Sequence, residues 1–376
     1  MSLLKKRFNR LTLMIKIIFK LPKSKIVLFD AFNKEIVINS ILKGDDYFVL
    51  ETRGKVIVLN YRVLYDLIRQ GGAIIKKKIF IDILREIKKL YFISIIDIVG
   101  PKILITYIDN DPYFHEVCRL RKDIIGVGIQ NGTRSHYNYH DKLDPERHNK
   151  YYLPYYFVHG NHVEHVYKEY NHQFKEIFVV GSIKLDYFLS KQKIIEDKQF
   201  ELCLISTWVI GDEVCGDYPF STENQYQVLM YIRDTIIKYG YKLVIALKTN
   251  KVSEVNFYKG IFHDNATYKF DSDDPFSSYS ICYKSKVILT TYSTLGFEFY
   301  SIGSNVVFFN FSGDVRFTHS ASNTITSLKG NKLNTLINQM LFEDKKYRYK
   351  SLNDVQCVQN NKPSFEVIRE FINKVI

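Results

Sequence analysis

The chain has 376 residues, of which 46% are hydrophobic and 15% aromatic, and it carries a formal net charge of +13 at pH 7. These values exclude a disordered tail, because so many apolar side chains can bury more than one core, and the length favours two domains. The five cysteines are odd in number and widely spaced without a CxxC pair, so the sequence predicts neither a disulfide framework nor a cysteine metal site. We therefore expect a reducing, cytoplasmic location.

The basic residues are concentrated at the amino end. Eight of them precede the first acidic residue, Asp30: Lys5, Lys6, Arg7, Arg10, Lys16, Lys20, Lys23 and Lys25. Residues 3–25 alternate these cations with apolar side chains at helical spacing, which is typical of a helix at an anionic membrane surface. The segment is too short and too charged to span a bilayer, and no signal-peptide cleavage site follows it. Two interpretations stay open: peripheral contact with the inner face of the cytoplasmic membrane, or an ordinary amphipathic helix packed on the domain.

Apolar, β-branched runs recur through the first half of the chain, and helix-compatible stretches at 81–96 and 162–174 separate some of them. The runs are 25–32, 55–61, 102–109, 124–132, 155–160 and 176–182. Continuous apolar strands alternating with helices predict a parallel sheet covered on both faces. A polar connector at 181–199 follows, and the alternation then restarts with strands at 200–207, 241–250, 266–270, 286–293 and 305–311, and helices at 223–240 and 364–375.

The sequence therefore predicts an α/β fold of two Rossmann-like domains, residues 1–195 and 196–376, with a ligand site at the carboxyl ends of strands in the cleft between them. Beyond residue 25 the cations are mixed with acids and no recognition motif is present, so we expect no nucleic-acid partner.

The run 285–311 places hydroxyls, a glycine and a carboxylate between two apolar strands: Ser293, Thr294, Gly296 and Glu298. A strand-to-helix joint there would offer backbone N–H groups and hydroxyls to a phosphate or diphosphate, and Glu298 could accept hydrogen bonds from ribose or sugar hydroxyls. The alternative interpretation is structural, with Ser293 as an N-cap that stabilises the first turn of the helix.

This run resembles the donor-binding signature of GT-B glycosyltransferases that build bacterial surface carbohydrate, and it is similar to a stretch of the CDP-glycerol glycerophosphotransferases. Residues 103–139 resemble the amino-terminal half of the same enzymes, including the Gln130-Asn131-Gly132 turn. The resemblance implies a GT-B fold and a donor that contacts Ser293, Thr294 and Glu298. We also expect Gly296 to belong to the donor site and the carboxyl-terminal helix to pack back on the fold.

Other donor-binding candidates follow strands of the second domain. Ser206 and Thr207 lie at its first strand-to-helix joint, and Lys248, Thr249 and Asn250 occupy the loop where related families carry a His-Pro pair. Lys248 would neutralise phosphate charge. Because a helix terminus and a basic residue can replace a metal ion, we expect no metal and no cofactor.

The catalytic base must lie within reach of the acceptor hydroxyl. Related enzymes carry His or Asp where this chain has Asn131, which cannot take a proton, so the candidates are Asp109, Asp111 and His136, with Asp109 preferred at its strand end. Asp109 and Asp111 also match a metal-binding DxD pattern, although Asp111 followed by Pro112 is equally typical of a helix start. For the acceptor we expect contacts from Gln130, Asn131, Arg134 and His159.

The predicted function is transfer of a sugar from a nucleotide-sugar donor to a growing surface glycan or a lipid-linked glycan acceptor. Two alternatives stay open: transfer of a polyol phosphate from a CDP-polyol, and a non-catalytic nucleotide- or glycan-binding module.

Overall fold

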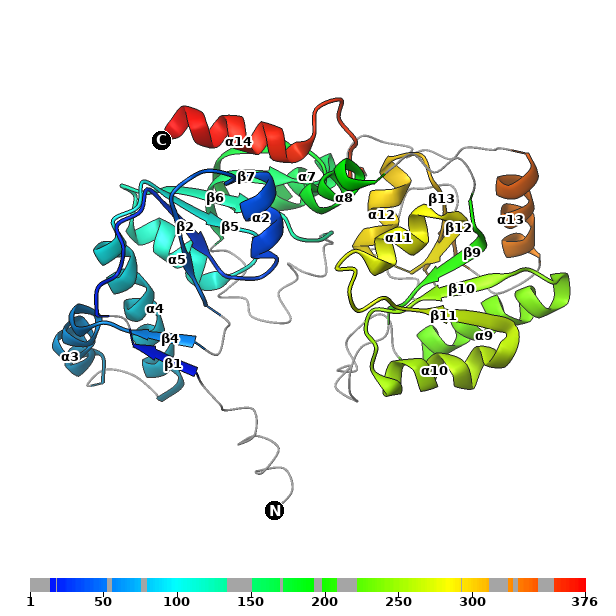
Figure 1. Ribbon diagram of the computed structural model, residues 1–376, viewed down its shortest axis with the longest axis horizontal. Coiled ribbons are helices and arrows are strands. Elements are labelled where there is room, and N and C mark those ends of the chain that lie inside the picture. The colour runs from blue at the N-terminus through cyan, green and yellow to red at the C-terminus, as the bar shows by residue number, and fades with distance from the viewer. Residues whose placement is uncertain are drawn as a thin grey trace, which may run out of the picture.

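The computed structural model describes residues 14–17, 19–52, 56–75, 80–133, 151–169, 172–192, 198–207, 222–291, 293–310, 324–326, 331–343 and 355–376. Two six-stranded sheets dominate this part of the chain, and every strand pair in them is parallel (Figure 1). The α/β prediction with two Rossmann-like sheets is confirmed.

The first sheet has the order β3-β2-β5-β6-β7-β8 and the second the order β11-β10-β9-β12-β13-β14. The first comprises β3 (Tyr47–Leu50), β2 (Ile26–Phe29), β5 (Ile103–Thr106), β6 (Ile125–Ile129), β7 (Tyr152–Val158) and β8 (Gln173–Val179). The second comprises β11 (Ala266–Lys269), β10 (Leu243–Ala246), β9 (Phe200–Ile205), β12 (Ser285–Thr290), β13 (Asn305–Phe309) and β14 (Thr324–Ile325). Strands β2, β5 and β10 are buried along their whole length, as continuous apolar runs require in a sheet covered on both faces.

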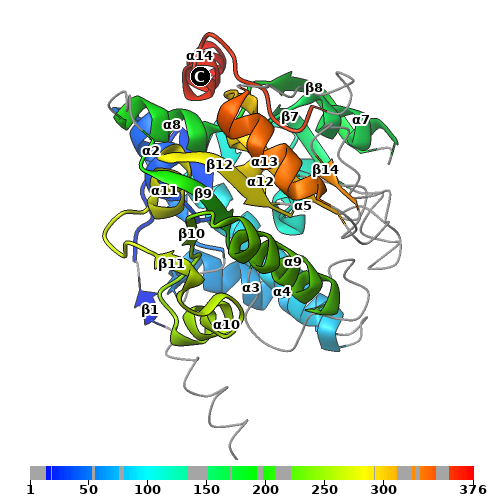
Figure 2. The same ribbon diagram turned by 90° about the vertical axis from the view of Figure 1, so that its right-hand side faces the viewer.

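Helices cover both faces of each sheet. On the first sheet, α2 (Lys34–Ser40) and α14 (Ser364–Val375) pack on one face, and α4 (Phe80–Val99), α5 (Pro112–Leu120) and α7 (Asn161–Glu169) on the other. On the second sheet, α9 (Thr222–Tyr239), α10 (Val252–Phe262) and α13 (Lys332–Phe342) cover one face, and α11 (Ser277–Tyr283) and α12 (Thr294–Ser301) the other. Figure 2 shows α9 and α13 lying in front of the second sheet. A short 3₁₀ turn, His263–Asn265, follows α10.

The chain passes between the sheets twice. Helix α8 (Ile183–Lys191) contributes Ile183 to the core of the first sheet and Leu185 to a core of the second. At the end of the chain, α14 returns to the first sheet, where Ile368 and Ile372 are buried. Asp186 of α8 accepts a hydrogen bond from the Ser364 backbone N–H at 2.6 Å, so α8 fixes the start of the returning helix. The expected packing back of the last helix is confirmed, while the boundary at 195/196 lies outside the described residues and stays a prediction.

The helix expected over residues 3–25 is wrong where the structure describes it. Residues Met14–Ile17 form strand β1, which pairs in parallel with β4 (Val56–Leu59) in a separate two-stranded sheet, and Ile26–Phe29 already belongs to β2. The reason is tertiary: the Met-Ile-Lys-Ile run finds a β-branched partner strand, and ladder pairing overrides helical spacing. Residues 1–13 and 18 lie outside the described ranges.

None of the helices among the described residues combines the length and apolarity that crossing a bilayer requires.

Candidate functional site

A cavity of about 550 Å³ lies between the two sheets, where the carboxyl ends of their strands meet. From the first domain it is lined by Phe32 and Asn33 after β2, Asn131 after β6 and Lys184 of α8. From the second it is lined by Ile205, Ser206, Thr207, Lys248, Phe270, Ser272, Asp274, Pro275, Ser277, Ser278, Tyr279, Ser293, Thr294, Leu295 and Glu298. This is the position at which open parallel sheets bind ligands.

The amino terminus of helix α12 forms part of the cavity wall. Ser293 occupies the N-cap position, yet among the described residues its side chain makes no capping hydrogen bond. Ser293 is therefore the N-cap residue, as the structural alternative expects, but its hydroxyl does not cap the helix. Thr294 begins the helix, and its Oγ1 accepts a hydrogen bond from the Thr133 backbone N–H at 3.0 Å, which joins the two domains at the cavity.

Gly296 serves packing and does not line the cavity. A Cβ atom at this position would lie 2.5 Å from Cγ2 of Thr290, so glycine lets α12 approach strand β12 closely. This close approach sets the position of the helix terminus.

Glu298 lies one turn into α12 and is buried at the cavity wall. Its carboxylate accepts hydrogen bonds from the Ser182 hydroxyl and, at 2.6 Å, from the Tyr279 hydroxyl. Burial raises the pKa of Glu298 above its ordinary value, although these two hydrogen bonds and the charge of Lys184 act in the opposite direction. Glu298 therefore lines the cavity, and its predicted contact with a donor stays a prediction.

Two lysines line the cavity, one from each domain. Lys248 was predicted, and its side chain is exposed at the end of β10. Lys184 was missed by the sequence reasoning, because only the fold brings the start of α8 to the second domain. Its ammonium lies 5.0 Å from the ring centroid of Tyr279 and 5.9 Å from that of Phe276. Burial lowers the pKa of Lys184, and the negative charge of Glu298 partly opposes this shift.

Glu254 of α10 organises the predicted loops of the second domain. It is fully buried, and its carboxylate accepts hydrogen bonds from the Ser206 hydroxyl at 2.5 Å, the Lys248 N–H at 2.8 Å, and the Thr249 N–H and hydroxyl at 2.8 and 2.6 Å. Thr249 is therefore a loop-fixing residue that does not line the cavity. Sequence reasoning missed Glu254, whose only signal is an acidic side chain in the first turn of a helix.

Of the two remaining donor candidates, Thr207 and Asn250, only Thr207 lines the cavity. Its Oγ1 accepts a hydrogen bond from Gln225 Nε2 at 2.8 Å. Asn250 is exposed and lies outside the cavity lining.

Asp109 lies behind the cavity wall. Its side chain is fully buried, and its carboxylate accepts a hydrogen bond from the Tyr156 hydroxyl at 2.5 Å and one from the Asn131 N–H at 3.2 Å. The preferred catalytic residue therefore holds Asn131, which lines the cavity.

The Gln130-Asn131-Gly132 turn is fixed in the same way. Gln130 is fully buried; its Nε2 donates to the Gly132 carbonyl at 2.6 Å, and its Oε1 accepts from the His159 N–H at 2.7 Å. His159 is 2% exposed and is not among the cavity-lining residues. Of the four predicted acceptor contacts, the structure brings only Asn131 to the cavity, while Arg134, like the candidate base His136, lies outside the described residues.

Asp111 is a helix cap. Its Oδ1 accepts a hydrogen bond from the Tyr113 N–H at 2.9 Å, and Pro112 is the first residue of α5. The helix-start interpretation of Asp111 is confirmed. Across the described ranges, no group of three or more His, Cys, Asp or Glu residues is arranged to hold a metal ion.

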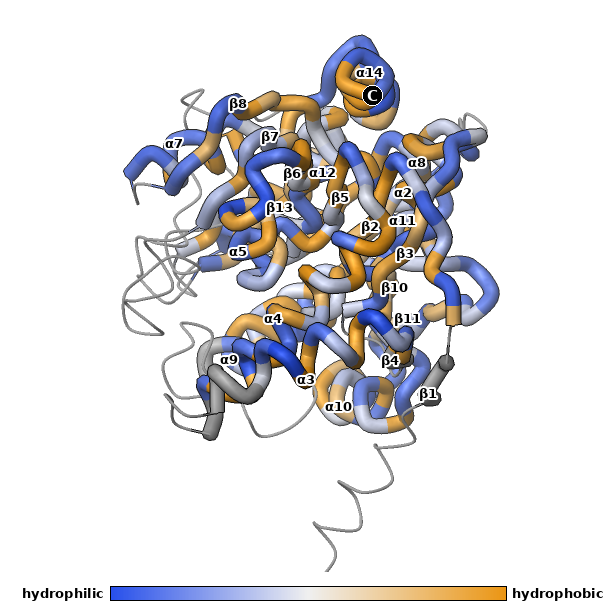
Figure 3. Tube along the Cα trace, turned by 90° about the vertical axis from the view of Figure 1, so that its left-hand side faces the viewer, coloured by the Kyte–Doolittle hydropathy of each residue, from blue (hydrophilic) through white to orange (hydrophobic). Residues whose placement is uncertain are grey.

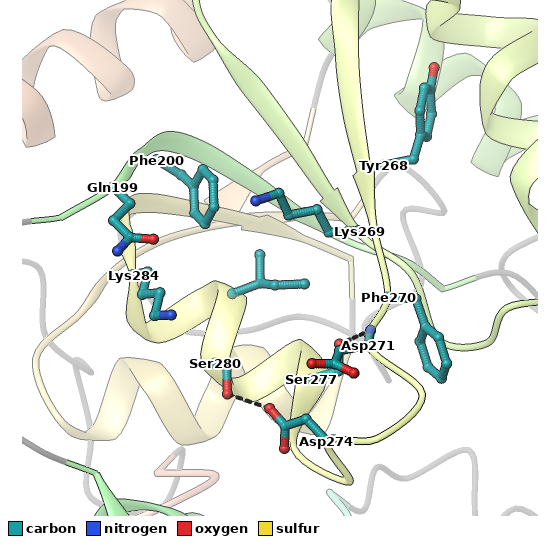
Figure 4. Close-up of a pocket in the computed structure, with 11 residues that line it drawn as sticks. Gln199, Phe200, Tyr268, Lys269, Phe270, Asp271, Asp274, Ser277, Ser280 and Lys284 are labelled. Atoms are coloured by element: carbon teal, nitrogen blue, oxygen red, sulfur yellow. Dashed lines mark hydrogen bonds between the residues drawn. The ribbon is translucent and has the colours of Figure 1, made fainter.

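A second cavity of about 360 Å³ lies beside α11. In Figure 4 the Lys269 side chain approaches Phe200, and its ammonium lies 4.5 Å from that ring centroid. Asp274 accepts hydrogen bonds from the Ser280 hydroxyl and the Phe276 N–H, both at 2.7 Å. All residues that line this second cavity belong to the second domain, whereas both domains line the larger one, so we place the site in the larger cavity between the domains.

Several solved structures of GT-B proteins share this arrangement of two parallel α/β domains. UDP-GlcNAc 2-epimerase from Methanocaldococcus jannaschii matches with a TM-score of 0.54 at 14% identity, over 93% of this chain and 99% of that one. The S. aureus MnaA–UDP co-structure matches with a TM-score of 0.56 at 13% identity, over 95% of this chain and 98% of that one. The wall teichoic acid polymerase TagF matches with a TM-score of 0.53 at 12% identity, over 94% of this chain and 89% of that one. At these identities the likeness shows a shared GT-B fold.

A family model described as "putative O-antigen biosynthesis protein" matches residues 127–325, more than half of the chain. The chain belongs to this O-antigen biosynthesis family. The matched region begins within β6 and ends with β14, and so includes the Asn131 turn, Lys184 and the whole second-domain side of the cavity. A search of curated protein sequences found no match to this chain.

Proposed function

We propose that the protein is a metal-independent glycosyltransferase that moves a sugar from a nucleotide-sugar donor to a growing surface glycan or a lipid-linked glycan acceptor. The observation that carries the proposal is the cavity in which the start of α12 and two lysines from opposite domains face the same space. Membership of the O-antigen biosynthesis family supports a surface-glycan product.

The donor's diphosphate is assigned to the start of α12. The first N–H groups of a helix are unpaired and positively polarised, and the Ser293 hydroxyl adds a donor beside them. Lys184 and Lys248 supply positive charge without a metal ion. When the sugar leaves, negative charge develops on the departing diphosphate, and these preorganised groups stabilise it.

Glu298 is assigned to donor hydroxyl groups. It lies at the cavity wall one turn beyond the proposed diphosphate position, within the same cavity. Its hydrogen bonds to Ser182 and Tyr279 fix the carboxylate in one orientation, and a fixed acceptor costs less to order when ligand binds.

The acceptor is assigned to the first-domain side, where Asn131 faces the cavity. In an inverting transfer the acceptor hydroxyl attacks the anomeric carbon, its proton passes to a base, and the bond to the diphosphate breaks. Because Asp109 is buried behind Asn131, we assign it a positioning role and retain His136 as the predicted base.

Donor turnover tests this function. The protein is incubated with UDP-, GDP-, CDP-, CMP- and dTDP-linked sugars and with CDP-glycerol, together with a lipid-linked glycan extract, and products are weighed by mass spectrometry. A sugar mass increment on the acceptor is expected. A phosphopolyol increment would support the polyol-phosphate alternative, an epimerised donor without acceptor product would support an epimerase, and unchanged donors throughout would support a binding module.

A further inference from the structure

Helix α3 (Tyr61–Ile75) has two apolar faces, and only one of them is packed. Val63 is fully buried in the core formed with α4, and Leu67 packs against that core. On the other side, an apolar stripe is exposed to solvent: Tyr61 63%, Leu64 42%, Tyr65 62% and Ile68 78%. These positions follow an i, i+3, i+4, i+7 pattern and so form one continuous face.

The backbone of Phe19 lies beside the start of this helix. Its side chain is 80% exposed, and its carbonyl accepts a hydrogen bond from Asn60 Nδ2 at 2.7 Å. Asn60 in turn accepts from the Arg62 N–H at 2.9 Å at the start of α3. Phe19 is therefore held beside the first turn of the helix, and we call Phe19, Tyr61, Leu64, Tyr65 and Ile68 the α3 face.

Cations border the α3 face. The guanidinium of Arg62 lies 5.7 Å from the ring centroid of Tyr61, and that of Arg69 lies 5.9 Å from Tyr65. Lys20 follows Phe19 and is exposed. Asp66 is the one acidic residue in the α3 sequence. Figure 3 shows both hydrophobic and hydrophilic residues along this helix.

We propose that the α3 face docks the protein on an anionic membrane surface. Tyrosine, leucine and isoleucine flanked by arginine and lysine suit the headgroup boundary, where apolar side chains enter the acyl region and cations pair with lipid phosphates. Helix α3 lies at the outer edge of the first domain, at the lower left of Figure 1, and its exposed residues are not among those that line the interdomain cavity. The proposal therefore stands independently of donor chemistry.

The test is co-sedimentation of the full chain with vesicles of phosphatidylethanolamine and phosphatidylglycerol at 3:1, compared with vesicles of phosphatidylcholine alone. The wild type is expected to bind the anionic vesicles preferentially. Two double variants, Leu64→Ser/Ile68→Ser and Arg62→Gln/Arg69→Gln, are each expected to lose about tenfold or more in partition coefficient.

The matched control is Val252→Ser/Phe342→Ser, which removes two apolar side chains that are 72% and 77% exposed elsewhere. This control is expected to bind vesicles as the wild type does, and all variants are expected to keep the thermal midpoint because the replaced side chains are exposed. Wild-type vesicle binding by both α3 variants would overturn the proposal. Loss of a dimer in sedimentation velocity without loss of vesicle binding would instead assign the α3 face to a second copy of the chain.

Discussion

Ser182, which caps helix α8 after the first sheet, donates a hydrogen bond to the carboxylate of Glu298 in helix α12 of the second domain. The contact joins the two domains at the wall of the cavity to which we assign the donor. Together with the Thr133–Thr294 contact, it means that cavity shape depends on how the two domains meet.

The first prediction concerns the pH dependence that Glu298 imposes on stability. Burial raises its pKa above 4.5 in the folded state, so folding favours the protonated form. The stabilisation of the folded state by protonated Glu298 is fully present below the unfolded-state pKa. It is lost as pH rises through the raised folded-state pKa, with a slope of up to about 1.4 kcal/mol per pH unit. Urea unfolding of wild type and Glu298→Gln over a pH series should show the wild type losing stability relative to the variant in that window. Parallel profiles would contradict the assignment.

The second prediction separates phosphate binding from nucleoside binding. Lys184→Met should weaken binding of a nucleoside diphosphate about tenfold, because one ammonium contact with phosphate is lost, corresponding to about 1.4 kcal/mol. Binding of the unphosphorylated nucleoside should change little. Isothermal titration measures both, with Lys251→Met as the control at an exposed lysine outside the cavity lining. An equal loss for nucleoside and diphosphate would remove Lys184 from the phosphate site.

The third prediction distinguishes two roles for Asp109. If it positions Asn131 through its hydrogen bonds, then Asp109→Asn and Tyr156→Phe should both raise the KM for acceptor while donor affinity stays the same. If Asp109 is the base, Asp109→Asn should lose on the order of 10²–10⁴ in kcat, and Tyr156→Phe should not follow it. Steady-state kinetics with varied acceptor decides between the two patterns.

The fourth prediction uses His115, which is buried against the Tyr152 carbonyl at 3.2 Å and stacks on Tyr151. Burial lowers the pKa of His115 from 6.5 to about 4. Its contribution to stability is therefore present above pH 6.5 and is lost as pH falls from 6.5 to 4, to a total of about 3 kcal/mol. Compared with His115→Gln, the wild type should lose that amount more over this range in chemical unfolding. An identical acid dependence in the two proteins would contradict the shift.

The sequence predicts much of the fold because its strands are short, continuous apolar runs, such as Ile103–Thr106 and Leu243–Ala246. The helices between them instead repeat their apolar residues at helical spacing, so the two kinds of element can be told apart. The sequence also places Ser293 and Lys248 at the ligand cavity, because ligands bind at the carboxyl ends of parallel strands, and both residues line it.

The rest depends on tertiary contacts that no local pattern encodes. Lys184 reaches the cavity only because α8 passes between the domains. Asp109 follows the end of β5, as expected, yet the Tyr156 hydroxyl of β7, two strands away in the sheet, donates a hydrogen bond to its carboxylate. Strand β1 pairs with a segment about forty residues away, which helical spacing within residues 3–25 does not reveal.

A donor site at the start of α12 is tested most directly by isothermal titration of the wild type and Ser293→Ala with UDP, GDP, CDP and dTDP. We expect saturable binding of at least one of these nucleotides with one site per chain, weakened by roughly 1–2 kcal/mol in Ser293→Ala, because a hydroxyl donor beside the helix terminus is lost. Absence of binding by every nucleotide, or equal affinity in the two proteins, would contradict a donor site at the start of α12.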